Sequence, residues 1–426
     1  MAKAPKAKTK AVKVNFHEQL ILNKWLWSKF NPNRLEGMKQ QLDHPQFEGI
    51  EHEGDNAGQT KFFSVISNTL FNKQVVDIDV LRRYDLNIVK HWQKITEKRN
   101  EIEGHVLNLK YFQYLSLLFT ELYLDQYFHH QADMLNELNV ELEQYNHDQK
   151  SDVEQFQQYL PEDLNKIGYW NATGSGKTLL MHVNILQYLD YFQNQNGDST
   201  YPDQIILLTP NEGLSEQHLQ ELTDSGFQAT LFDKQKSRNS LYRDEIQIID
   251  MNKLSDSDGD KTVATMSLEG KNLVLIDEGH RGTSSSAGAW MERRDILTKD
   301  GFSFEYSATF GQAVSKADNV YKRFEDAKKQ KAKMLYGMAI NKLTEEQKKN
   351  IQLDELEQQK YRREALREVY AKSILFDYSY KYFYADGYGK EVNILNMKEY
   401  HEDDERNLYL TACLLSFYQQ QYLFKK

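Results

Sequence analysis

Cysteine is almost absent from this chain, because Cys413 is the single one among 426 residues. A framework of internal disulfides is therefore excluded, and a chain of this length can bury a core without one. Both points favour a reducing compartment, so we expect a cytoplasmic protein. The chain also lacks an N-terminal stretch with a basic start, an apolar centre and a small-residue cleavage site, so we do not expect secretion.

An uninterrupted apolar run of membrane-spanning length is missing as well. The most apolar window covers residues 111–128, and Gln113, Glu121, Asp125 and Gln126 interrupt it. Burying these side chains in a bilayer would cost several kcal/mol in total. The window therefore predicts a buried helix in a water-soluble protein, and we expect no membrane partner.

Positive charge is in deficit, with 53 Lys and Arg against 63 Asp and Glu and a formal net charge of −10. This balance argues against simple electrostatic coating of DNA, because affinity for phosphate chains comes from clustered Lys and Arg. The N-terminus is the exception, with Lys3, Lys6, Lys8, Lys10 and Lys13. We interpret residues 1–15 as a disordered basic tail, for which solubility is a better explanation than a nucleic-acid arm.

The apolar pattern divides the remaining chain into four parts. Residues 16–165 carry Leu, Tyr and Phe stripes at helical spacing, which predict a mainly helical accessory region. From 166 to 315, short apolar runs alternate with amphipathic segments, as in βα units around a parallel sheet. The expected strands are Ile167–Trp170, Gln204–Thr209, Glu245–Asp250, Asn272–Asp277 and Phe302–Ser307.

The C-terminal parts are less regular. Residues 316–372 are highly charged and predict a helical connector. In residues 373–426, an aromatic-rich segment predicts a pair of strands that turns near Asp386–Gly387. A terminal helix is expected over Asn407–Phe424.

The strongest signal is the string NATGSGKT at residues 171–178, between a predicted strand and a predicted helix, which is the context of a phosphate-binding loop. Two glycines allow a tight backbone path whose N–H groups face phosphate oxygens, next to the positive N-terminus of a helix. Lys177 can reach the β- and γ-phosphates, and the Thr178 hydroxyl can coordinate Mg²⁺. We therefore predict that ATP and Mg²⁺ bind to Thr173, Gly174, Ser175, Gly176, Lys177 and Thr178. The general pattern G-x-x-x-x-G-K-S/T has glycine where this chain has Asn171.

A second motif is NLVLIDEGH at residues 272–280, an apolar strand with two carboxylates at its C-terminal end. Ligands bind at that end of the strands in open α/β sheets. We expect Asp277 to hold Mg²⁺ through water, and Glu278 to orient and deprotonate the attacking water. We expect His280 to couple the state of the nucleotide to a neighbouring lobe. The alternative is an ordinary solvated acidic loop.

Two further segments are interpreted together with these motifs, because each alone is a weak signal. FSFEYSATF places Ser307, Ala308 and Thr309 at the end of a strand, where small hydroxyl side chains can contact the carboxylates and transmit the state of the nucleotide. IILLTPNEGLSEQH presents Thr209, Asn211 and backbone N–H groups where a strand ends and a helix begins, which suits contact with nucleic-acid phosphates. A plain turn before a helix fits the second segment too.

These four segments, in this order and at these spacings, resemble motifs I, Ia, II and III of superfamily 2 helicases of the DExH type. Within that superfamily, ATGSGKTLLMHVN, TPNEGLSEQH, LIDEGHRG and FEYSATFG look most like the Res-type helicase subunits of type III restriction enzymes and related bacterial phage-defence helicases. The resemblance covers residues 167–311. It implies an α/β fold with a RecA-like parallel sheet flanked by helices, a helical region before it, and a helical plus small β extension after it.

The resemblance also implies a function and the residues that perform it. It implies ATP hydrolysis coupled to movement on nucleic acid, DNA rather than RNA, in restriction or phage defence. It assigns Lys177, Asp277 and Glu278 to catalysis. In such helicases a glutamine upstream of motif I reads the adenine edge, and Gln113 is the candidate here. A glutamine in the core of a helix is the equal alternative.

One expected part of such a motor has no match in the sequence. Superfamily 2 motors close a second RecA-like lobe over ATP, with arginines in a Q-x-x-G-R-x-x-R setting, and no such string follows Thr309. An arginine finger is worth about 10³–10⁵ in turnover. We therefore expect the chain to bind ATP·Mg²⁺ but to hydrolyse it slowly, unless a partner chain or a further C-terminal lobe supplies the arginine. A nuclease signature of spaced carboxylates with lysine is not visible either.

Two other functions remain open at this point. An RNA-remodelling DExH ATPase would share all four motifs. A nucleotide-sensing assembly protein would use the helical N-terminal half to bind partners and ATP to order the interface. The presence of Glu278 speaks against the sensor, because a protein that does not hydrolyse ATP needs no base.

Overall fold

The computed structural model describes residues 16–70, 77–149, 155–197, 200–233, 244–255, 263–278, 294–310, 318–389 and 403–424. The basic tail predicted for residues 1–15 lies outside these ranges. Contacts divide the chain into two compact units, residues 1–383 and 384–426. The accessory helices, the sheet and the connector therefore all belong to the first unit.

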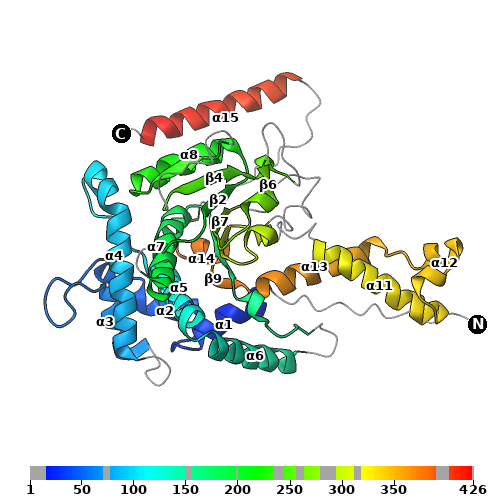
Figure 1. Cartoon of the computed structure of the whole chain (residues 1–426). Helices are drawn as coiled ribbons and strands as arrows, with labels where there is room; N and C mark the ends of the chain where they lie inside the picture. The colour runs from blue at the N-terminus through cyan, green and yellow to red at the C-terminus, as the bar shows by residue number, and fades with distance from the viewer. Residues whose placement is uncertain are drawn as a thin grey trace, which may run out of the picture. The chain divides into compact units, whose positions relative to one another are not determined.

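A seven-stranded parallel sheet forms the centre of the first unit (Figure 1). Its strands are β1 (Lys166–Asn171), β2 (Ile205–Thr209), β3 (Ala229–Leu231), β4 (Ile246–Asp250), β7 (Leu273–Asp277), β8 (Phe302–Ser307) and β9 (Ile374–Tyr378). They lie in the order β3-β4-β2-β7-β8-β1-β9, and each neighbouring pair is parallel. The strands β5 (Leu254–Ser255) and β6 (Val263–Ala264) form a separate pair. The predicted α/β fold is confirmed, and the five predicted strands are present.

Both faces of the sheet are buried, which explains why its strands read as continuous apolar runs. Side chains alternate between the faces along a strand. On β2, Ile205 and Leu207 belong to the core that includes the N-terminal helices, whereas Ile206 and Leu208 belong to a second cluster on the opposite face. The sheet therefore separates two apolar layers.

The helices of the first unit come mainly from the N-terminal half. In the described ranges they include α1 (Ile21–Trp27), α2 (Leu35–Leu42), α3 (Lys61–Val65), α4 (Ile78–Glu103), α5 (Tyr111–His129), α6 (Gln131–Asp148), α7 (Lys177–Asn196), α8 (Glu212–Asp224), α11 (Asp318–Tyr336), α12 (Glu345–Asn350) and α13 (Glu355–Ala371). Helix α5 packs against α7 and β9, and α4 packs against α7 and α8. The accessory helices thus cover one face of the sheet directly. No helix in the described ranges is long and apolar enough to cross a membrane.

A buried carboxylate lies where α4, α5 and α7 meet. Glu121 is fully buried and accepts hydrogen bonds from Asn87 Nδ2 at 3.0 Å, Gln187 Nε2 at 2.7 Å and Tyr191 Oη at 2.8 Å. Burial raises the pKa of Glu121 to about 7, although these three donors act in the opposite direction. The three helices are therefore joined by a polar network centred on a single acidic group.

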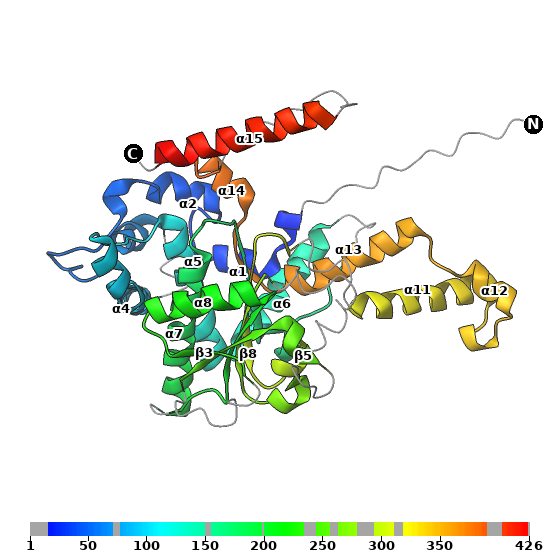
Figure 2. The same cartoon turned by 90° about the horizontal axis from the view of Figure 1, so that it is seen from above.

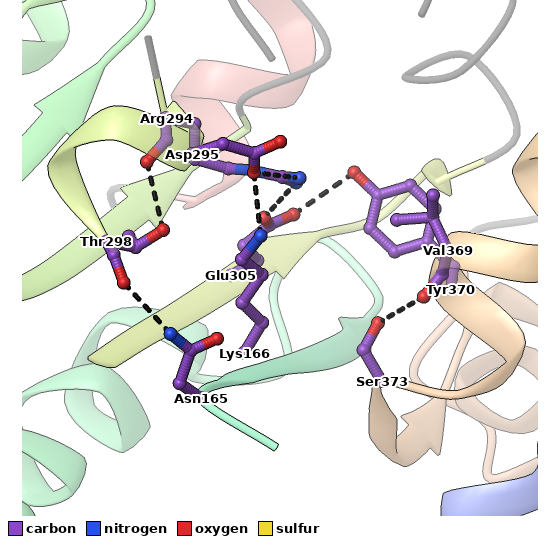
Figure 3. Close-up of polar contacts among 9 residues, drawn as sticks. All are labelled: Asn165, Lys166, Arg294, Asp295, Thr298, Glu305, Val369, Tyr370 and Ser373. Atoms are coloured by element: carbon purple, nitrogen blue, oxygen red, sulfur yellow. Dashed lines mark hydrogen bonds and ion pairs between the residues drawn. The ribbon is translucent and has the colours of Figure 1, made fainter. Parts of the chain in front are cut away.

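The connector is helical, as its sequence predicts. Helices α11 and α13 lie side by side (Figure 2), and Arg323 on α11 pairs with Glu368 on α13. Figure 3 shows how α13 returns to the sheet: Tyr370 Oη donates to Glu305 Oε2 at 3.1 Å, and Arg294 Nη1 donates to Glu305 Oε1 at 2.5 Å. These side chains line a cavity of about 1110 Å³ whose lining does not include the phosphate loop.

The pair of strands predicted after residue 373 is wrong for the described residues. Ile374–Tyr378 instead forms β9, which joins the main sheet in parallel beside β1. Every residue of this strand is buried there, and an isolated two-stranded hairpin could not bury both of its faces. The chain then forms the short helix α14 (Tyr380–Ala385). Residues 390–402 lie outside the described ranges. In the second unit, α15 (Asp403–Phe424) confirms the predicted terminal helix.

Candidate active site

The phosphate loop follows β1 and ends at the start of α7. Gly174 and Gly176 have φ angles of 89° and 83°, in the left-handed region that favours glycine. Asn171, which stands where the general pattern has glycine, is the last residue of β1 and is 1% exposed. This departure from the pattern therefore lies in the strand and leaves the glycine turn intact. Of the predicted contacts in this loop, Thr173 is exposed and Thr178 half-buried.

The start of α5 supports this loop from the accessory region. Gln113 Nε2 donates to Ser175 O at 3.0 Å, and Gln113 Oε1 accepts from Lys110 N at 3.0 Å. A Cβ atom at Gly176 would lie 2.4 Å from Gln113 Nε2. The structure thus places Gln113 against the loop. Its side-chain amide joins the backbone of Ser175 in the loop to the backbone of Lys110 before α5.

Lys177 brings the two strongest motifs together. Its Nζ lies 2.8 Å from Asp277 Oδ1 and 2.6 Å from Glu278 Oε1. Burial would raise the pKa of Asp277, but a hydrogen bond from His218 and the charge of Lys177 outweigh burial and lower this pKa to about 2. The carboxylate is therefore ionised at neutral pH. The first residues of α7 and the end of β7 form one charged cluster at the carboxyl edge of the sheet.

The backbone at Glu278 is strained and is held in place by β8. Its φ of 51° is the single positive value for a non-glycine residue in the described part of the chain. Such conformations persist where neighbours enforce them, often at functional sites. Tyr306 O accepts from Glu278 N at 2.9 Å, while Ser307 Oγ and Ala308 N donate to the carboxylate at 3.3 and 3.4 Å. Thr309 N donates to Ser307 Oγ at 3.0 Å, so two residues of the predicted coupling tripeptide contact this carboxylate and the third contacts Ser307.

Strand β8 is tied in turn to the helix that follows the phosphate loop. Tyr306 Oη donates to Asn184 Oδ1 on α7 at 2.7 Å, and its ring stacks on Tyr169 of β1 with centroids 4.9 Å apart. All three side chains are buried. The position of Glu278 therefore depends on contacts that reach both β1 and α7.

The residues predicted to contact nucleic acid have different environments. Thr209 is fully buried, and its Oγ1 lies 2.6 Å from Ser215 Oγ. Asn211 is exposed, and its Oδ1 accepts from Leu214 N at 3.0 Å, which caps the N-terminus of α8. Of the two residues predicted to contact nucleic acid, Asn211 is therefore the exposed one. His280 lies outside the described residues.

One residue of the site was missed by the sequence reasoning. His218 on α8 is 4% exposed, and its Nε2 lies 2.9 Å from Asp277 Oδ2. The signal that could have revealed it is helical spacing, because His218 lies on one face of α8 with Ser215 and Leu222, the other buried residues of this helix.

Part of the chain is similar to a known protein family. Residues 126–312 match the family model described as type III restriction enzyme, res subunit, a domain of helicase superfamily 2. The chain has no match among curated proteins. One similar solved structure is the Sulfolobus solfataricus SWI2/SNF2 ATPase core in complex with dsDNA, with 14% identity, 33% of this chain and 27% of that chain covered, and a TM-score of 0.23. The family match supports an ATP-dependent, helicase-like function.

Proposed function

We propose that this chain, whose residues 126–312 match the family model of the res subunit of type III restriction enzymes, is the ATP-binding lobe of a DNA translocase or helicase in restriction or phage defence. One observation carries this proposal. Lys177 Nζ lies within 2.8 Å of both Asp277 and Glu278, so the lysine of the phosphate loop and the acidic motif occupy one site. Neither motif alone would support hydrolysis.

The residues present fit a nucleotide triphosphate with Mg²⁺. Gly174 and Gly176 give the loop the left-handed turns that expose successive N–H groups. A Cβ atom at Gly176 would lie 2.4 Å from Gln113 Nε2, so the loop leaves no room for a side chain there. Thr178 and Asp277 are the oxygen donors that Mg²⁺ prefers. When bound, Mg²⁺ neutralises charge on the phosphates. Lys177 binds and orients the terminal phosphates.

Glu278 is proposed as the base that orients and deprotonates water. The strained backbone directs its carboxylate toward Lys177, and Ser307 and Ala308 hold the oxygens. A movement of this tripeptide would displace the base, which supports a coupling role for residues 307–309. His280 is proposed to assist in this coupling.

Gln113 is proposed to support the phosphate loop. Its contacts to Ser175 and Lys110 favour this role, and adenine recognition by its side chain stays a prediction. Asn211 is proposed to contact nucleic-acid phosphate, together with backbone N–H groups at the start of α8. For Thr209 the same role stays a prediction, because its hydroxyl pairs with Ser215.

The test is ATP hydrolysis by the purified chain, with and without single- and double-stranded DNA and RNA, alongside Lys177→Ala and Glu278→Gln. We expect ATP binding that Lys177→Ala abolishes and Glu278→Gln retains. Turnover should be slow, because no Q-x-x-G-R-x-x-R string follows the third motif. Stimulation of hydrolysis by RNA and not by DNA would refute the preference for DNA. If Lys177→Ala kept both ATP binding and turnover, the proposed site would be refuted.

A further inference from the structure

Helix α8 contacts the carboxyl ends of two strands through the polar side chains on its buried face. Ser215 Oγ lies 2.6 Å from Thr209 Oγ1 at the end of β2. His218 Nε2 lies 2.9 Å from Asp277 Oδ2 at the end of β7. The helix that begins at the exposed Asn211 is therefore bonded to a carboxylate of the candidate active site.

The two oxygens of Asp277 have different partners. Oδ1 lies 2.8 Å from Lys177 Nζ, and Oδ2 lies 2.9 Å from His218 Nε2. An ionised carboxylate can only accept hydrogen bonds, so the imidazole donates from Nε2. The side chains of His218 and Asp277 are 6% and 8% exposed, and little water competes for this bond. The imidazole thus fixes the rotation of the carboxylate.

Packing alone does not explain an imidazole at this position. His218 Nδ1 is buried and has no hydrogen-bond partner among the described residues. A buried polar atom without a partner lowers stability, and an apolar side chain of similar size would avoid this cost. The one polar contact that the ring makes in the described part of the chain is the contact to Asp277.

We propose that His218 is a positioning residue for Mg²⁺, which holds Asp277 Oδ2 so that Oδ1 stays directed toward Lys177 and the metal. This inference rests on the proposed function, because it requires ATP·Mg²⁺ at the phosphate loop. Hydrogen-bond partners of metal-binding side chains orient them, and their loss typically lowers metal affinity by about 10–100-fold. His218 is predicted to act through Asp277 and not on ATP itself.

The experiment measures binding of a fluorescently labelled ATP to the full chain by anisotropy, first without metal and then across a MgCl₂ titration. The variants are His218→Leu, which removes the donor, His218→Asn, whose amide is too short to reach Asp277, and His218→Gln, whose amide nitrogen can replace Nε2. Ser215→Ala is the matched control, because it removes the polar contacts of Ser215 Oγ to Thr209 and Asn211 on the same helix face without touching Asp277.

We expect the half-saturating Mg²⁺ concentration to rise roughly tenfold in His218→Leu and His218→Asn, the lower end of the range for such partners. Metal-free binding should stay unchanged, and His218→Gln and Ser215→Ala should behave as wild type. A wild-type Mg²⁺ requirement in the Leu or Asn variant would overturn the inference, as would an equal rise in Ser215→Ala. If the wild-type chain does not bind labelled ATP at any Mg²⁺ concentration, the proposed function itself fails, which is a different result from a Mg²⁺ requirement that does not change.

Discussion

Replacing Glu121 with glutamine should change how the stability of this protein depends on pH. The carboxyl group is fully buried between α4, α5 and α7, and burial raises its pKa from 4.5 to about 7. A glutamine has nearly the same size and can still accept hydrogen bonds from Asn87 and Gln187. The variant therefore removes the titration and keeps most of the packing.

The sign and size of the effect follow from linkage. A carboxyl group whose pKa is higher in the folded state than in the unfolded state binds its proton more tightly when folded. Its contribution to stability is fully present below pH 4.5 and is lost as the pH rises through about 7. Over this pH interval the contribution of Glu121 to the free energy of unfolding falls by roughly 3 kcal/mol, since each pH unit corresponds to about 1.4 kcal/mol.

The assay is urea unfolding of the wild type and Glu121→Gln from pH 4.5 to pH 8, followed by tryptophan fluorescence. The difference between the two free energies of unfolding cancels the other titrating groups, including Asp85, whose pKa burial raises to about 6. Relative to the variant, the wild type should lose up to about 3 kcal/mol over this range. A difference that stays constant with pH would refute the reasoning.

Two further substitutions test contacts described above. Gly176→Ala should abolish binding of labelled ATP and lower the free energy of unfolding, because the left-handed backbone costs roughly 1–2 kcal/mol for alanine and the new Cβ would meet the Gln113 amide. In a Gln113→Ala background, where that amide is absent, urea unfolding should show a smaller loss of free energy. Arg294→Met should leave Glu305 buried without its cation and lower the free energy of unfolding by about 3–5 kcal/mol, whereas the double variant Arg294→Met/Glu305→Leu should recover most of that loss in thermal unfolding.

The sheet and the meeting of the two main motifs could be predicted because both depend on local patterns. A strand that is buried on both faces is a continuous apolar run, as at Leu273–Asp277. Parallel strands end at one edge of the sheet, so the loop after β1 and the carboxylates after β7 had to lie near one another. The proximity of the phosphate loop to the acidic motif follows from topology and needs no knowledge of side-chain packing.

The contacts that refine the site could not be read in the same way. His218 and Asp277 lie 59 positions apart, and their contact depends on how α8 is rotated against β2 and β7. Gln113 reaches Ser175 because α5 begins beside the loop, which depends on the packing of the accessory helices. The aromatic residues after Ser373 fit a hairpin or a buried strand equally well by composition, and the open edge of β1 decides between them.

The place of β9 beside β1 affects the protein while it is being made. Asn171 of β1 pairs with Tyr378 of β9, and Ala172 N donates to Tyr378 O at 2.9 Å. Roughly 200 residues separate these partners, which at about 5–20 residues per second corresponds to about 10–40 s of synthesis. Until β9 leaves the ribosome, the backbone groups on this edge of β1 have no partner strand, so the edge is open to wrong pairing. Because Ala172 leads into the candidate phosphate loop, the start of this loop gains its hydrogen bond to β9 only after that delay.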